Sequence, residues 1–225
     1  MGRGQLILIE GLDRSGKSTQ TAILQSKLQQ TGGRAELIKF PDRSTKIGGI
    51  INQYLTDKSF TLPDQAAHLL FLANRWELAV EIERKLNEGV FVVLDRYIYS
   101  GIAYSLAKLK QNPSNPKEMA DVEWLYAPDK GLPKPDLTLF LTLDLDQIGD
   151  RKGWGEERYE MTEFQSKVKE CFLQVLSQDS IISNENVVLV DVNNKLIEQV
   201  TELLWNKIQE SNGNVLVDTP IKYLT

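Results

Sequence analysis

The sequence has one cysteine and one histidine among its 225 residues. A single cysteine, Cys171, excludes a disulfide within the chain and any zinc or iron–sulfur site with several cysteine ligands. A single histidine, His68, excludes the two-histidine zinc motifs. Both residues lie in apolar segments with helical spacing, so we expect them to be packed in the core rather than to act as ligands or nucleophiles.

Long apolar runs and an excess of positive charge are also missing. No stretch approaches the roughly 18 apolar residues that a membrane span needs, and nothing at the start of the sequence resembles a targeting signal. With 26 basic and 31 acidic side chains, the net charge of −5 argues against binding nucleic acid or a membrane through bulk charge. The scarcity of cysteine fits a reducing compartment. We expect a soluble protein of the cytoplasm, with the nucleus as a second location.

The chain alternates short apolar runs with longer helical patterns, which predicts an α/β fold with a parallel sheet covered by helices on both faces. The expected strands are rich in Val, Ile and Leu and comprise residues 6–10, 36–40, 90–94, 137–143 and 187–190. The expected helices are 17–30, 45–56, 64–88, 99–110, 118–126, 159–178 and 195–210. Gly32 and Gly89 close two of these helices in the manner of C-cap glycines.

Residues 11–18, GLDRSGKS, match the phosphate-loop pattern G-x-x-x-x-G-K-[ST] and lie between a predicted strand and a predicted helix. Glycines let backbone N–H groups wrap closely around phosphate oxygens, and the helix N-terminus favours negative charge. Lys17 supplies a positive charge to the β- and γ-phosphates, and Ser18 is a candidate Mg²⁺ ligand. The motif predicts a P-loop NTPase fold that binds a nucleoside triphosphate through Gly11, Arg14, Ser15, Gly16, Lys17, Ser18 and Thr19.

Arginines gather at the predicted carboxyl ends of the strands. Arg14 lies within the loop, and Arg43 and Arg96 each follow an aspartate directly after a strand. Strand carboxyl ends line the ligand crevice of an open α/β sheet, so these side chains should point to one place. Three arginines and a lysine exceed what one triphosphate needs. A second, phosphate-bearing substrate and a phosphoryl-transfer reaction are therefore predicted.

The predicted helix 64–88 adds an aromatic ring beside a hydrogen-bond donor. Phe71 and Arg75 are four residues apart and share one face, as a pair that stacks on and hydrogen-bonds a nucleobase would. Taken alone, Phe71 is more often a core residue. A buried Arg75 requires a polar partner.

These segments resemble the thymidylate kinase family of the eukaryotic type. The resemblance is collinear over about residues 3–195 and is carried by 6–20, FPDRST at 40–45 with IG at 47–48, HLLF at 68–71, ANRWE at 73–77, DRY at 95–97 with SG at 100–101, GLPKPD at 131–136 and GEERYE at 155–160. It implies Mg²⁺-dependent transfer of the γ-phosphoryl group of ATP to dTMP, giving dTDP, by a homodimeric enzyme.

On the donor side, the resemblance implies that Lys17 and the loop amides hold the ATP phosphates, while Arg14 clamps the transition state. Asp95 positions Mg²⁺ together with Ser18. A lid at about residues 149–160 would place Arg151 over adenine, bring Arg158 and Tyr159 near the reacting phosphates and include Glu160; Asn193 belongs to the adenine-side loop. The catalytic residues implied are Arg14, Lys17, Asp95 and Arg96.

On the acceptor side, the resemblance implies that Asp13 takes the sugar 3′-hydroxyl and that Arg43 and Arg96 hold the dTMP phosphate. The base site would be formed by Phe71 stacking on thymine, Arg75 and Ser100 reading its polar edge, Tyr97 excluding ribonucleotides, and Phe40, Gly101 and Tyr104 completing the walls.

Two other functions stay open at this stage: another nucleoside or nucleotide kinase, and a regulatory module that binds nucleotide without catalysis. A GTPase would need an Asn-Lys-x-Asp signature, which the sequence lacks. We predict one domain over residues 1–212 and a tail of unknown role at 213–225. The segment 111–120 is longer and richer in proline than the family pattern, and the tail has no evident family counterpart.

Overall fold

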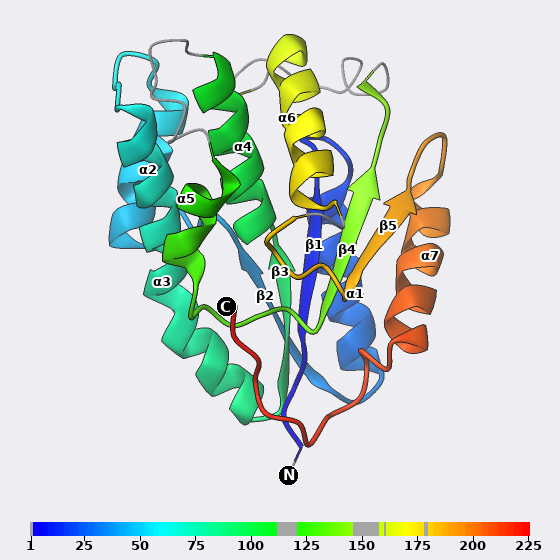
Figure 1. The fold of residues 1–225 in the computed structure, drawn as a ribbon. Coiled ribbons are helices and arrows are strands. Elements are labelled where there is room, and N and C mark those ends of the chain that lie inside the picture. Colours follow the sequence, from blue (N-terminus) through cyan, green and yellow to red (C-terminus); the bar gives the residue numbers. More distant parts are fainter. Residues whose placement is uncertain (1, 112–120, 146–157, 160, 178–179) are drawn as a thin grey trace.

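Five parallel strands form one sheet in the order β2-β3-β1-β4-β5 (Figure 1). The computed structural model describes residues 2–111, 121–145, 158–159, 161–177 and 180–225. The two central strands β1 and β3 are buried along their whole length, as expected of strands covered on both faces. The strands are β1 (Leu6–Gly11), β2 (Arg34–Lys39), β3 (Val90–Asp95), β4 (Leu137–Thr142) and β5 (Val187–Asp191).

Helices cover both faces of this sheet. Figure 1 shows α4 and α6 in front of the strands and α1 behind them; α1 packs against α7, and α4 packs against α3 and α6. The helices are α1 (Lys17–Gln30), α2 (Lys46–Thr56), α3 (Asp64–Asn87), α4 (Ile98–Gln111), α5 (Val122–Tyr126), the 3₁₀ helix η2 (Ala127–Asp129), α6 (Thr162–Val175) and α7 (Ile197–Glu210).

The predicted α/β fold with a five-stranded parallel sheet is confirmed, and α1 begins and ends where the pattern places it. Gly32 and Gly89 have φ angles of +87° and +75°, as the predicted helix ends require. The predicted helix 159–178 is shorter at both ends, and the Asn184 side-chain amide donates to the carbonyl of Val175, the last residue of α6, at 3.1 Å. Of the predicted helix 118–126, residues 118–120 lie outside the described part.

The register of the sheet brings the predicted site segments together. Ile9 of β1 lies opposite Asp95 of β3, and Gly11 lies opposite Leu141 of β4. The loop that leaves β1 and the Asp95–Arg96 pair that leaves β3 therefore emerge side by side at one edge of the sheet. This placement follows from parallel pairing alone.

Segments remote in sequence meet at the opposite edge of the sheet. The main chains of Arg3 and Val217 exchange two hydrogen bonds of 2.8 and 3.0 Å. Beside them, the Arg3 guanidinium forms an ion pair with Asp136 at 2.7 Å. In Figure 1 the final residues cross beneath the sheet from α7 toward α5. The tail is thus hydrogen-bonded to the domain along its path.

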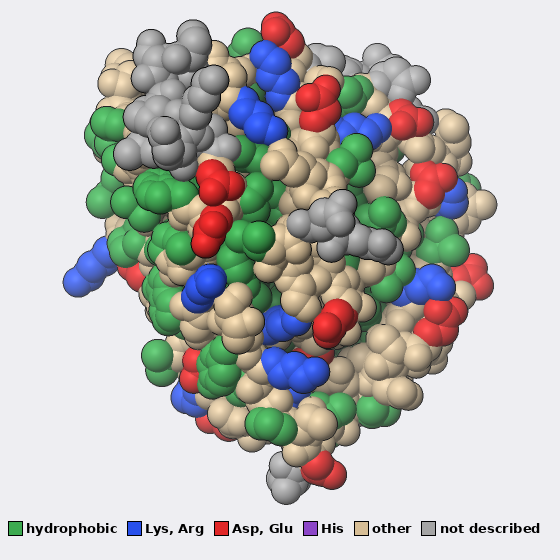
Figure 2. Space-filling view, in the orientation of Figure 1, with side chains coloured by type: hydrophobic (Ala, Val, Ile, Leu, Met, Phe, Trp, Pro, Cys, Tyr) green, Lys and Arg blue, Asp and Glu red, His purple; other side chains and the backbone are tan. Residues whose placement is uncertain are grey.

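No described helix is both long and apolar enough to cross a bilayer. On the face shown in Figure 2, basic and acidic side chains are interspersed over the surface.

The two residues expected to be structural are both buried. Cys171 is packed in the core cluster, 2% exposed, and burial raises the pKa of its thiol. His68 is 1% exposed, with Nδ1 2.8 Å from the Ser105 hydroxyl and Nε2 3.0 Å from the Leu125 carbonyl. A neutral imidazole satisfies both contacts by donating to the carbonyl and accepting from the hydroxyl. Burial, with the nearby charge of Arg75, lowers the pKa of His68 to about 4.

This lowered pKa predicts a stability loss in mild acid. The unfolded chain takes up a proton at its histidine near pH 6.5 and the folded chain only near pH 4, so the stabilisation is present above pH 6.5 and is lost as the pH falls toward 4. In urea unfolding, the difference in unfolding free energy between the wild type and His68→Gln should shrink by up to about 3 kcal/mol between pH 7 and pH 4. The sequence holds no second histidine, so a constant difference would contradict the prediction.

Candidate active site

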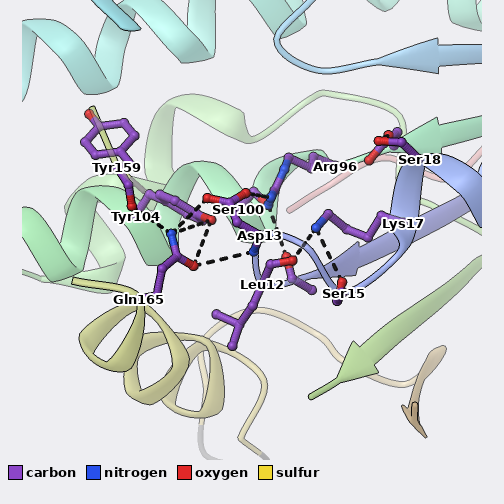
Figure 3. A network of polar contacts seen from close by, with 12 residues as sticks. Leu12, Asp13, Ser15, Lys17, Ser18, Arg96, Ser100, Tyr104, Tyr159 and Gln165 are labelled. Atoms are coloured by element: carbon purple, nitrogen blue, oxygen red, sulfur yellow. Dashed lines mark hydrogen bonds and ion pairs between the residues drawn. The ribbon is translucent and has the colours of Figure 1, made fainter. Parts of the chain in front are cut away.

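The loop between β1 and α1 forms a compact cradle. Arg14 and Gly16 adopt positive φ angles of 64° and 94°, which turn successive N–H groups to the same side. Lys17 is 5% exposed; its ammonium donates to the Leu12 carbonyl and lies 3.4 Å from the Ser15 hydroxyl, within the curl of the loop (Figure 3). Burial, aided by the charge of Arg96, lowers the pKa of Lys17 to about 7. The Lys17 ammonium thus lies where the oxygens of a bound triphosphate would replace the Leu12 carbonyl as its hydrogen-bond partner.

Arg96 joins the end of β3 to the phosphate loop. Its guanidinium forms an ion pair with Asp13 and donates to the Gly11 carbonyl at 3.1 Å and to the Ser100 hydroxyl at 2.8 Å. Its φ angle of 71° is uncommon for a residue with a side chain and is typical of functional sites. Burial alone would raise the pKa of Asp13, but the charges of Arg96 and Lys17 outweigh it and lower that pKa.

Glu10, which the sequence analysis did not single out, supports this cluster from within the sheet. It is fully buried, and its carboxyl group accepts from the backbone N–H groups of Tyr97 and Ser100 at 2.9 and 3.0 Å and from the Ser100 hydroxyl at 2.5 Å. These bonds hold the first turn of α4 and, through Ser100, the Arg96 guanidinium. Glu10 could have been identified from the sequence, because a charged residue at the end of an apolar strand is unusual.

Gln165 is a second residue that the sequence analysis missed. It is fully buried on α6; its amide donates to the Asp13 carboxylate at 2.8 Å and to the Tyr159 carbonyl at 3.0 Å, and lies 3.3 Å from the Tyr104 hydroxyl (Figure 3). It therefore ties the segment after the predicted lid to the phosphate loop. Nothing in its sequence context marks it, because two of its three partners, Asp13 and Tyr104, are remote in sequence.

The two predicted metal ligands converge. The Ser18 hydroxyl donates to the Asp95 carboxylate at 2.6 Å, and both groups are oxygen donors of the kind that Mg²⁺ binds. Among the described residues there is no cluster of three or more carboxylate, histidine or cysteine side chains that could form a cage for a metal. The pair suits an ion that keeps water and substrate phosphates as its other ligands.

A cavity of about 160 Å³ opens beside the Asp13–Arg96 pair. Phe71 and Tyr159 contribute rings to its wall, and Lys108 and Asp64 also line it. All ten residues predicted for the acceptor site line it: Asp13, Phe40, Arg43, Phe71, Arg75, Arg96, Tyr97, Ser100, Gly101 and Tyr104. Residues from five segments of the sequence thus form one site.

Arg75 has the buried partner that its position demands. Asp129 of η2 accepts from Nε and Nη2 of Arg75 at 2.8 Å each, and the two side chains are 3% and 0% exposed. Burial raises the pKa of Asp129 despite this pairing. The remaining Nη1 lies beside Gly101, where an added Cβ would stand 2.5 Å from it. A side chain at Gly101 would therefore displace the guanidinium from the cavity wall.

Two predicted contacts differ from the structure. Arg158 does not face the phosphate loop: its guanidinium donates to the carbonyls of Tyr54, Asp57 and Phe60, because the last turn of α2 and the loop after it offer oxygens without helical partners. The Ser100 hydroxyl is engaged between Glu10 and Arg96 rather than open to a base. Arg151, Glu160 and nearly all of the predicted lid lie outside the described residues.

The remaining predicted residues lie around the same edge of the sheet. Arg14 is half-buried and Thr19 is exposed at the start of α1. Arg43 follows β2, and its guanidinium donates to Asn52 at 3.1 Å. Asn193 follows β5, and its side-chain oxygen accepts from the backbone of Asp144 at 2.9 Å.

Comparisons with known proteins show which family the chain resembles. The family model described as thymidylate kinase matches residues 9–204. Thymidylate kinase of Homo sapiens is 45% identical over 200 residues, covering 89% of this chain and 87% of that protein, and that of Schizosaccharomyces pombe is 44% identical over 207 residues, covering 89% and 93%. The solved thymidylate kinase from Candida albicans is 56% identical with a TM-score of 0.93 and covers all of both chains. That match includes the tail for which the sequence analysis found no family counterpart.

The position of Glu10 generates a stability prediction. Replacing Glu10 by Gln puts an amide NH₂ against a donor and should lower the unfolding free energy by roughly 2–3 kcal/mol. Glu36→Gln in β2 is the matched control; its side chain is 49% exposed and pairs with Lys85, so its change should stay within about 0.5 kcal/mol. Equal losses in urea unfolding of the two variants would contradict the role given to Glu10.

Proposed function

The chain belongs to the thymidylate kinase family, whose members phosphorylate dTMP to dTDP with ATP, and we propose that the cavity beside the phosphate loop is its dTMP site. The observation that carries this assignment is the convergence of all ten implied acceptor residues on one cavity. The cavity adjoins the cradle that contains Lys17, so an acceptor phosphate and a donor γ-phosphate would meet between them. This arrangement supplies the proximity on which phosphoryl transfer depends.

The base would lie between aromatic walls with one cationic edge. Phe71 borders the cavity from α3, where Tyr54 packs edge-on at 6.3 Å and holds its ring. Phe40 and Tyr97 also line it, with ring centroids 5.5 Å apart. Arg75, fixed by Asp129, offers its remaining N–H groups to a base oxygen. Tyr97 is 1% exposed, and its bulk beside the sugar position would disfavour a 2′-hydroxyl.

The acceptor phosphate would bind Arg96 and Arg43. Arg96 already holds Asp13, so the phosphate would share the guanidinium with that carboxylate, which fixes the orientation of both. Asp13 in turn is held by Gln165, leaving it placed to accept from a sugar hydroxyl. The ion pair thus aligns sugar and phosphate together.

On the donor side, Lys17 and the loop N–H groups would bind the ATP phosphates, with Arg14 stabilising charge that develops during transfer. The hydroxyl of Ser18 and the carboxylate of Asp95 would hold Mg²⁺, whose chemistry is to neutralise phosphate charge. Thr19, Arg151 and Asn193 would complete the ATP site, with Arg158, Tyr159 and Glu160 in the lid. Arg158 then contributes by anchoring that segment to α2.

We also propose a homodimer and retain the cytoplasm, with the nucleus, as the expected location. Exposed apolar side chains on α2 and α3 favour self-association: Ile50, Leu69 and Trp76 are 44%, 44% and 41% exposed, and Val80 is 77% exposed. Sedimentation velocity of the purified chain decides this point, and a monomer at micromolar concentration would contradict it. One domain with a lid at 149–160 remains our domain proposal.

Replacing Phe71 by Ala tests the acceptor site. Loss of base stacking should raise the KM for dTMP by about 10-fold or more, while the KM for ATP changes less than about twofold. The assay is dTMP-dependent release of ADP. Phe60→Ala is the control, since this ring belongs to the same cluster of α2 and α3 but does not line the cavity. An unchanged dTMP KM in the Phe71 variant would contradict the assignment.

Replacing Asp95 by Asn tests the Mg²⁺ site. We expect the Mg²⁺ concentration for half-maximal activity to rise by about 10–100-fold, since a carboxylate that positions the ion is removed. Asp191→Asn, a carboxylate at the end of another strand, should leave the Mg²⁺ dependence unchanged. Identical Mg²⁺ titrations for both aspartate variants would contradict the proposed ligand pair.

Replacing Arg14 by Ala tests its proposed role in the transition state. In the same assay Arg14→Ala should lower kcat far more than it raises the ATP KM.

A further inference from the structure

The tail makes a second set of contacts, close to the acceptor cavity. Beyond the Arg3 contacts, Leu224 forms two main-chain hydrogen bonds with the segment after η2: its carbonyl accepts from Gly131 and its N–H donates to Leu132, each at 2.9 Å. Lys134 donates to the carbonyl of Lys222 at 2.8 Å. Figure 1 shows the end of the tail beside the segment that follows α5.

The tail also contacts the residue before η2. The Tyr126 hydroxyl, at the end of α5, donates to the Thr225 carbonyl at 3.1 Å. The Leu224 side chain is 5% exposed and belongs to the main core cluster. Residues 222–225 therefore hold η2 from both of its ends.

A single turn such as η2 has little stability of its own, so its position depends on contacts from outside. From α3, the indole of Trp76 donates to the Pro128 carbonyl at 3.0 Å, and Arg75 pairs with Asp129. Further contacts come from the tail. Leu224 is thus connected to Arg75 by its two main-chain hydrogen bonds to the segment after η2, by η2 itself and by the buried ion pair between Asp129 and Arg75.

We propose that residues 222–225 are a positioning element for the acceptor base, because they fix η2 and through Asp129 the direction of the Arg75 guanidinium. This inference rests on the proposal that Arg75 contacts the acceptor. The tail makes no chemical contact with substrate; its effect is to keep Arg75 preorganised. Loosening the tail should therefore weaken dTMP binding and leave the donor side intact.

Two tail variants test this: Leu224→Ala and a chain lacking residues 222–225. We expect the KM for dTMP to rise by about three- to tenfold in both, with kcat at saturating dTMP and the KM for ATP within about twofold of the wild type. Tyr126→Phe removes only one hydroxyl and keeps the fold; it should raise the dTMP KM by about twofold. Leu224→Ala keeps the test decisive where the deletion fails to fold.

Leu28→Ala in α1 is the matched control, the same exchange at a fully buried site remote from η2. If it raises the dTMP KM as much as Leu224→Ala does, general loss of stability explains the effect and the proposal is overturned. Arg75→Lys separates the proposed acceptor role of Arg75 from the proposed positioning role of the tail. An unchanged dTMP KM in that variant overturns the acceptor role of Arg75, whereas a raised value with normal tail variants overturns only the role of the tail.

Discussion

Buried charge is the constraint around which the site is arranged. Glu10 and Lys17 are buried and Asp13 and Arg96 are half-buried at the carboxyl ends of β1 and β3, and any one of these charges left without partners would be costly. Arg96 contacts Asp13 directly and Glu10 through Ser100, while the Lys17 ammonium is held by oxygens of its own loop. Each group is stable there because the others compensate it, which leaves a preorganised field for anionic substrates.

The same field explains why the two substrate sites are adjacent. Arg96 borders the acceptor cavity, and the carboxylate it binds belongs to the donor loop. Gln165 adds a further connection, since its amide donates both to that carboxylate and to the carbonyl of Tyr159 in the proposed lid. Arg96 and Asp13 thus lie between the two proposed sites.

The sheet, the bounds of α1 and the loop around Lys17 could be predicted from the sequence, because they depend on local sequence pattern. Apolar runs, capping glycines and the phosphate-loop spacing predicted them. Partners that lie far apart in sequence were out of reach: Arg75 required a polar partner, but only the folded chain brings Asp129 to it. Arg158 was misplaced because open carbonyls after α2 compete for its guanidinium. Glu10 could have been found, as a carboxyl group in a buried strand.

The central place of β1 has a consequence for the order of folding. β1 precedes the other strands in the sequence, yet it pairs with β3 and β4, from Leu6 with Val92 to Gly11 with Leu141. Its neighbours must therefore be synthesised, and long loops closed, before the strand is held on both sides. The phosphate cradle at its end and the completed sheet thus form together. A nascent chain that stops before β4 would have the phosphate-loop motif without its function.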